Sequence, residues 1–103
     1  MAQNIYDNPE FFAGYSRFPR SAEGLTGMAE WPFLRAMLPR LERLEVIELG
    51  SGLGHFARWA ADQGAARVTG YELSNNMISS ARARNGADTI DYLRADLEEL
   101  ELA

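Results

Sequence analysis

The sequence contains no cysteine, a single histidine (His55) and no long apolar run. Without cysteine the chain can form neither disulfides nor thiolate metal sites, and one histidine cannot build a histidine-rich metal site, so no bound metal is expected. No stretch of about 18 apolar residues is present, so no membrane-spanning helix is predicted. The first residues lack a basic segment followed by an apolar one, so we expect a cytoplasmic protein without a signal peptide.

Positive charge is also scarce, since the formal net charge is -5. An acidic chain is poorly suited to non-specific phosphate contacts, so no nucleic-acid partner is expected. A chain of 103 residues can bury a core of marginal size and form one domain. Within that domain we predict an N-terminal helical region over residues 1–44 and a β-α-β-α-β segment over residues 45–103.

The N-terminal region carries signals for two helices. Asn8, Pro9 and Glu10 form a typical helix start, and the helix should end near Arg17. The stretch 21–27 is loop-like. A second helix is predicted over 29–38, because apolar residues recur there at the spacing of one buried face. These residues are Trp31, Leu34, Met37 and Leu38.

From residue 46 onward, short apolar runs alternate with helical patterns. The predicted strands cover 46–49, 67–73 and 90–94, and the predicted helices cover 53–63 and 74–84, the second capped by Ser74. An acidic turn or short helix is predicted over 96–102. This order implies parallel strands, so the fold class is α/β, with a Rossmann-like parallel sheet of three strands and flanking helices.

A glycine-rich turn, Gly50-Ser51-Gly52-Leu53-Gly54, directly follows the first strand. Glycine permits positive φ and close approach of a ligand to the backbone. Glu48 lies just before this turn, and Glu72 and Asp96 lie at or just beyond the ends of the next two strands. Because the carboxyl ends of parallel strands meet at one edge, the three acids should surround one cleft. A carboxylate at the position of Glu72 can accept hydrogen bonds from ribose hydroxyls.

The spacing of the turn also separates nucleotide classes. The dinucleotide fingerprint requires a glycine where His55 stands, and the phosphate-binding loop requires a lysine, which is absent near the turn. Glu48 would repel a phosphate and would suit a cationic ligand. A nucleoside without a phosphate therefore fits the pattern better.

These residues carry a family resemblance. The segments 46–54, 70–77 and 94–97 resemble, in order, three motifs of class I S-adenosylmethionine-dependent methyltransferases. The segment 6–15 resembles the lead-in of a bacterial subgroup that acts on small molecules. Ser51 departs from the subgroup, which often has cysteine there. The resemblance implies a Rossmann-like methyltransferase with S-adenosylmethionine as cofactor and a small-molecule acceptor.

The resemblance also implies roles for individual residues. The backbone of Gly50, Ser51 and Gly52 would contact the methionine part of the cofactor, with Glu48 nearby. Glu72 would hold the ribose hydroxyls.

Four further positions would surround the adenine. Leu73 and Met77 would flank the ring. Asp96 would accept a hydrogen bond from the adenine amino group, and the Leu97 N–H would donate one to a ring nitrogen. Tyr15 would close over the cofactor from the N-terminal helix.

Several alternatives stay open. No catalytic residue is identified, and His55 is interpreted as a structural residue rather than a general base. The chain could be a non-catalytic S-adenosylmethionine-binding or protein-interaction fragment, or a dinucleotide-dependent oxidoreductase, which the missing glycine at position 55 disfavours. The family has further strands after this point. We therefore expect a piece of a longer protein, or self-association through the edge of the strand over 46–49.

Overall fold

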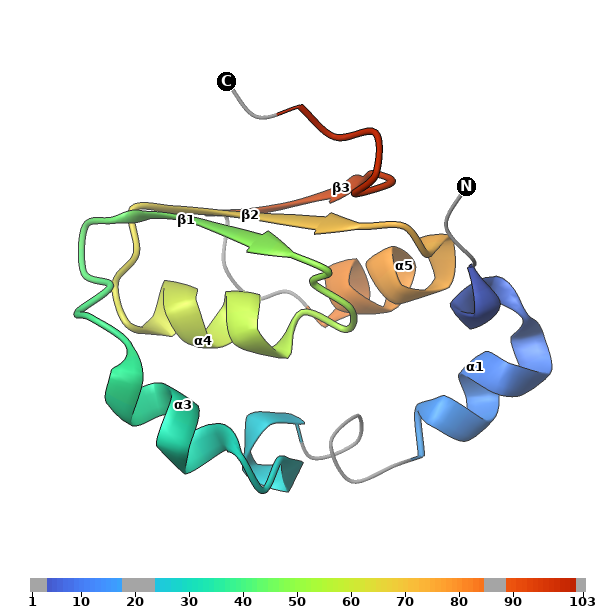
Figure 1. Cartoon of the computed structure of the whole chain (residues 1–103), viewed down its shortest axis with the longest axis horizontal. Coiled ribbons are helices and arrows are strands. Elements are labelled where there is room, and N and C mark those ends of the chain that lie inside the picture. Colours follow the sequence, from blue (N-terminus) through green and yellow to red (C-terminus); the bar gives the residue numbers. More distant parts are fainter. Residues whose placement is uncertain (1–3, 18–23, 85–88, 102–103) are drawn as a thin grey trace.

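A parallel three-stranded sheet forms the centre of the protein in a computed structural model, which describes residues 4–17, 24–84 and 89–101. The strands β1 (Glu45–Leu49), β2 (Arg67–Glu72) and β3 (Ile90–Arg94) lie in the order β1-β2-β3. The connecting helices α4 (His55–Asp62) and α5 (Asn75–Ala83) cover the same face of the sheet (Figure 1). The α/β prediction and the β-α-β-α-β order are confirmed.

The N-terminal region wraps around the outside of these helices (Figure 1). It contains the short helices η1 (Ile5–Asp7), α1 (Pro9–Tyr15), η2 (Gly24–Gly27) and α3 (Trp31–Met37). The helix η1 contacts the start of α5, and η2 contacts α4. None of the helices in the described ranges is long and apolar enough to cross a membrane.

Helix boundaries follow the capping signals of the sequence. The Asn8 side chain accepts a hydrogen bond from the Phe11 N–H at 3.0 Å, so α1 begins where predicted, although it ends at Tyr15. The Ser74 hydroxyl accepts from the Met77 N–H at 3.2 Å and starts α5. One detail differs from the predictions, because residues 24–27 form a 3-10 helix rather than a loop. The described part of 96–102 contains a turn, which is one of the two forms predicted there.

The core lies between the sheet and the two connecting helices. Val68, the second residue of β2, is fully buried against small side chains of α4 and α5. Alanines on these helices allow close approach to the sheet. The buried core cluster consists of Leu41, Ala57, Ala60, Ala65, Val68, Ile78, Ala81, Ile90 and Tyr92.

The predicted buried face of α3 is wrong. Met37 is 80% exposed and Leu34 is 45% exposed, so only part of the apolar stripe finds a partner. The helix is held chiefly by Trp31, whose ring packs edge-on against Trp59 of α4 at 4.9 Å between centroids. Helical spacing shows which residues share a face, but it cannot show whether another element covers that face.

The side of the sheet opposite α4 and α5 carries no helix among the described residues (Figure 1). Three apolar side chains stand on it, and we call Ile47, Leu49 and Leu93 the open face. Ile47 and Leu49 are each 53% exposed. β1 is also an edge of the described sheet, as the sequence predicts.

Candidate functional site

The glycine turn between β1 and α4 is held by β2. The Tyr71 carbonyl accepts hydrogen bonds from the Gly50 and Ser51 N–H groups at 2.8 and 3.0 Å. Gly50 and Gly52 have φ of +76° and +55°, a region that favours glycine. A Cβ at either position would meet nothing within 4 Å. Backbone conformation therefore requires these glycines, and the space beside them is open to a ligand.

The underside of the turn is closed. A Cβ at Gly70 of β2 would lie 2.7 Å from the Ser51 Cβ, and one at Gly54 would lie 2.5 Å from the Tyr92 hydroxyl. Real Cβ atoms do not tolerate such distances, so these glycines let the turn sit directly on β2 and β3. The turn therefore has one packed side and one open side.

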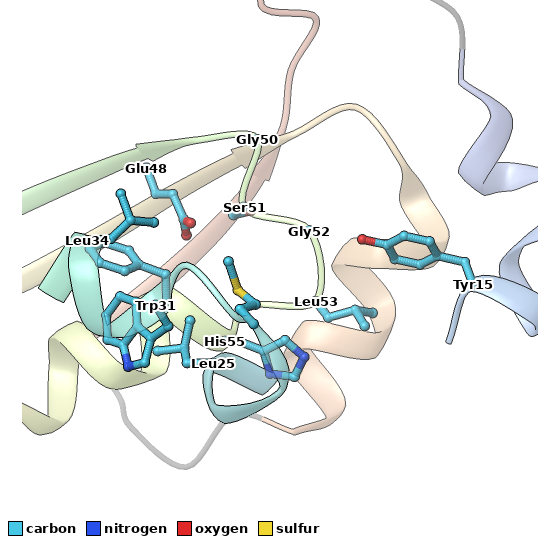
Figure 2. A pocket seen from close by; sticks show the side chains of 12 residues that line it. Tyr15, Leu25, Trp31, Leu34, Glu48, Gly50, Ser51, Gly52, Leu53 and His55 are labelled. Atoms are coloured by element: carbon cyan, nitrogen blue, oxygen red, sulfur yellow. The ribbon is translucent and has the colours of Figure 1, made fainter. Parts of the chain in front are cut away.

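A cavity of about 300 Å³ lies on the open side. The turn and Glu48 form one wall, and Tyr15 of α1 stands across Gly52 with its hydroxyl toward the turn (Figure 2). The other wall comes from η2, α3 and the start of α4 and is largely apolar. It contains Leu25, Met28, Trp31, Leu34, Leu53, His55 and Phe56.

The Glu48 carboxyl group points into this cavity (Figure 2). Its Oε1 atom is buried and accepts no hydrogen bond from the described residues, and the buried Ser51 hydroxyl likewise has no such partner. Burial, together with the negative charge of Glu72, raises the pKa of Glu48 to about 8. The carboxyl is therefore protonated at neutral pH and is available to a ligand.

Glu72 has the opposite environment. Its Oε1 accepts a hydrogen bond from the Gly52 N–H at 2.9 Å, and its Oε2 accepts from the Ser74 N–H at 3.0 Å. The carboxylate thus bridges the turn after β1 and the start of α5. Of the three acids that the sequence assigned to one cleft, Glu48 lines the cavity, and Glu72 is linked to the turn by a hydrogen bond but is not part of the lining.

The predicted cofactor residues fall into two groups. The described cavity lining includes Tyr15, Glu48, Gly50, Ser51 and Gly52, and a hydrogen bond links Glu72 to them.

The four residues assigned to the adenine lie outside that lining, at or beyond the ends of β2 and β3. Met77 is buried, with 3% exposure, whereas Leu97 is 46% exposed. Leu73 and Asp96 are half-buried. The Ala95 N–H donates to the Glu72 carbonyl at 2.9 Å and keeps the two strand ends together.

His55 has an oriented partner that the sequence analysis missed. Arg58, three residues further along α4, places Nη2 2.9 Å from His55 Nδ1 and donates through Nη1 to the Leu53 carbonyl at 2.8 Å. A guanidinium can only donate, so Nδ1 accepts and the imidazole carries its proton on Nε2. The spacing of three residues on one helix face was the available signal.

Asp7 is a second contact that the sequence analysis missed. Its Oδ1 accepts from the Ser74 hydroxyl at 2.6 Å and from the Asn76 N–H at 2.9 Å. Burial acts to raise the pKa of Asp7, but these bonds and those from Asn75 and Asn4 outweigh it and lower the pKa. The N-terminal segment is therefore fixed on the junction between β2 and α5.

Aromatic contacts connect Tyr15 to the part of the N-terminal segment that is held on α5. The Tyr6 ring packs edge-on against Phe11 and Tyr15, with centroids 5.4 and 5.0 Å apart. Asn76 Nδ2 donates to the Tyr6 carbonyl at 3.0 Å. Tyr15 thus stands at the cavity because Tyr6 is held on α5.

Comparison with known proteins agrees with this geometry. A family model described as a methyltransferase domain matches residues 46–103. The chain belongs to this methyltransferase family. A crystal structure of an S-adenosylmethionine-dependent methyltransferase from Mesorhizobium loti is 50% identical, with a TM-score of 0.75. The alignment covers 78% of this chain and 36% of that one. The fold is therefore the Rossmann-like fold of class I methyltransferases.

Two curated relatives also match this chain. A malonyl-[acyl-carrier protein] O-methyltransferase from Pectobacterium atrosepticum is 40% identical over 70 residues, which cover 68% of this chain and 26% of the relative. An uncharacterized protein from Haemophilus influenzae is 31% identical over 78 residues, which cover 76% of this chain and 31% of the relative. The chain thus spans about a third or less of the curated relatives it matches.

Proposed function

We propose that this chain forms the S-adenosylmethionine site of a methyltransferase and that the methyl acceptor is a small molecule. The observation that carries the proposal is the open glycine turn, with the Glu48 carboxyl beside it and Glu72 bonded to its backbone. When bound, the cofactor supplies a methyl group on a positively charged sulfur.

The residues present suit this cofactor. The buried Oε1 of Glu48 and the buried hydroxyl of Ser51 offer polar contacts to the methionine part, beside backbone left open at Gly50 and Gly52. The negative charge of Glu72 at the turn, and the carboxylate that Glu48 forms when it loses its proton, disfavour a phosphate and favour a cation. Glu72 has lone pairs beyond the two that its backbone donors use, and these can accept from ribose hydroxyls.

The adenine would lie toward the ends of β2 and β3, near Leu73, Met77, Asp96 and Leu97. This assignment follows from the family motifs and from the position of Glu72 between those residues and the turn. Tyr15 would cover the cofactor from the opposite side, because its ring already faces the turn across the cavity (Figure 2).

Methyl transfer requires a nucleophile in line with the sulfur–methyl bond, and holding that geometry supplies much of the rate. The contribution of this chain is to fix the cofactor with the turn and to shield the cavity from water with the wall around Trp31 and Phe56. No covalent protein intermediate is needed. The name of the Pectobacterium relative, which specifies O-methylation of malonyl-[acyl-carrier protein], supports a small organic group as the acceptor.

Calorimetric titration with S-adenosylmethionine, S-adenosylhomocysteine and NAD tests the proposal. We expect binding of the first two and no binding of NAD, whose pyrophosphate would face Glu48 and Glu72. If neither S-adenosyl compound binds, the proposal fails and a protein-interaction module becomes the better interpretation. If NAD alone binds, the proposal fails and a dinucleotide-dependent oxidoreductase becomes the better interpretation.

A further inference from the structure

We propose that Glu48 selects for positive charge by exchanging its proton for a cationic group of the cofactor. In the free protein the carboxyl is neutral. When a cation enters the cavity the O–H bond of the carboxyl breaks, the carboxylate pairs with the cation, and the proton goes to solvent. This inference rests on the proposed function, since it concerns the same cavity.

The position of Glu48 is the first observation behind this proposal. The residue lies one position before the end of β1, on the cavity wall opposite Trp31 and Leu34 (Figure 2). Its buried Oε1 accepts no hydrogen bond from the described residues. Burial without a hydrogen-bond donor disfavours the ionised carboxylate, so the neutral acid is favoured.

The charged groups around Glu48 favour its proton further. Glu72 on β2 accepts two backbone hydrogen bonds, and its negative charge opposes ionisation of Glu48. On β3 the nearby group is Tyr92, whose pKa burial raises and Arg58 acts to lower. Tyr92 is therefore neutral near pH 7 and brings no charge.

Among the described residues, the charged and titratable groups on the helices near Glu48 have other partners or carry no counter-charge for it. Arg58 of α4 donates to the Leu53 carbonyl and to His55, and it lies beside Tyr92. His55 accepts from Arg58 through Nδ1, and Tyr15 of α1 lies at the cavity with its phenol ring. No positive charge from the described residues acts on the Glu48 carboxyl, and we infer that a ligand supplies one.

The cofactor and its analogues provide a graded set of charges. S-adenosylmethionine has an ammonium and a sulfonium, S-adenosylhomocysteine has only the ammonium, and methylthioadenosine has neither. Calorimetry near pH 7 in phosphate and in Tris, buffers of different ionisation enthalpy, measures the protons released on binding. We expect nearly one proton for S-adenosylmethionine and none for methylthioadenosine.

S-adenosylhomocysteine identifies which cation Glu48 faces. Release with both S-adenosyl compounds supports pairing with the ammonium, and release with S-adenosylmethionine alone supports pairing with the sulfonium. Release that is equal for all three ligands overturns the proposal, because methylthioadenosine has no cation to exchange.

Two variants separate Glu48 from other titrating groups. Glu48→Gln copies the neutral acid and should bind without proton release, whereas Glu45→Gln changes an exposed acid on the same strand and should release the proton as the wild type does. In the wild type the affinity should rise about tenfold per pH unit below about pH 8 and then level off. In Glu48→Gln this slope should be absent.

The ¹³C NMR resonance of the Glu48 carboxyl can be followed in the wild-type protein, so this measurement does not depend on whether a variant folds. It should titrate near pH 8 in the free protein and at a lower pH with S-adenosylmethionine bound. Cofactor binding without proton release, or release that persists in Glu48→Gln, overturns this inference and leaves the proposed function standing. A chain that binds none of the ligands overturns both.

Discussion

The Gly52 N–H donates a hydrogen bond of 2.9 Å to the carboxylate of Glu72, so the glycine turn after β1 is held by the residue that ends β2. The second oxygen of the same carboxylate accepts from Ser74 at the start of α5. A single side chain therefore sets the distance between the two segments that would hold the methionine and nucleoside parts of a cofactor. Glu72 therefore positions the turn in the free protein, and in the proposed complex it would also bind the ribose.

Replacing Glu72 with alanine should weaken S-adenosylmethionine binding by about 1–3 kcal/mol, the range for losing a charged hydrogen-bond partner. Calorimetric titration measures the change. Asp91→Asn is a suitable control, because Asp91 is an exposed acid on β3 that should not affect affinity. Unchanged affinity in Glu72→Ala would refute the ribose assignment.

Gly70→Ala should reduce cofactor affinity by about tenfold or more, since the new methyl group would collide with Ser51 and push the turn away from β2. Gly14→Ala is the matched control. A Cβ at Gly14 meets nothing within 4 Å and lies in α1, so this variant should gain about 0.5–1 kcal/mol of stability. Thermal melts and titrations of both variants test the pair. Wild-type cofactor affinity in Gly70→Ala would contradict the prediction, because it would show that the turn can shift without weakening cofactor binding.

Glu48 should make the free protein less stable as the pH rises. Its pKa is raised to about 8 in the folded state, from about 4.5 in the unfolded chain, so the folded state holds the extra proton between these values. The stabilising contribution is complete below about pH 4.5 and is lost as the pH rises through about 8. The melting temperature of Glu48→Gln should therefore exceed that of the wild type increasingly toward pH 8. Parallel curves for the two proteins would contradict this expectation.

Asp7→Asn should detach the N-terminal segment from α5 and cost about 1 kcal/mol at neutral pH, a value moderated by solvent exposure. The pKa of Asp7 is lowered, so its contribution is present above about pH 3.8 and is lost as the pH falls through the lowered value. Denaturant unfolding at several pH values measures the difference. Glu10→Gln, an exposed acid in the same segment, should change stability by a few tenths of a kcal/mol. An equal loss in both variants would rule out a specific role for Asp7.

The edge strand β1 should support self-association of the chain, and Ile47→Lys should weaken it. A charged side chain on an exposed edge opposes pairing with another strand. Light scattering after size-exclusion chromatography should show a mass that rises with concentration for the wild type and less so for the variant. Phe33→Lys removes another exposed apolar group, away from the sheet, and should behave as the wild type. A wild-type monomer at all concentrations would contradict the prediction.

Local chemistry made much of the fold predictable. The strand over 90–94 was predicted with its observed bounds, and the caps at Asn8 and Ser74 start helices where the sequence placed them. Glycines after a strand marked the turn, and the order of strands and helices indicated a parallel sheet. Each of these signals lies within a few residues of the feature it specifies.

Contacts between distant residues were not predictable in the same way. Asp7 and Ser74 are 67 positions apart, and no periodicity links them. The apolar wall formed by Met28, Trp31 and Phe56 also joins separate elements, and the sequence analysis assigned α3 a buried face instead. Asp96 and Leu97 were identified from a motif, but their relation to the cavity depends on where the chain turns after β3.

The open face has a practical consequence for studies of folding. Fluorescent dyes that bind exposed apolar surface are commonly used to detect molten globules. Ile47, Leu49 and Leu93 offer such a surface in the native state of this chain. A bright dye signal from a sample with cooperative melting should therefore be assigned to the native sheet, and partial unfolding should be diagnosed from near-ultraviolet circular dichroism of Trp31 and Trp59 instead.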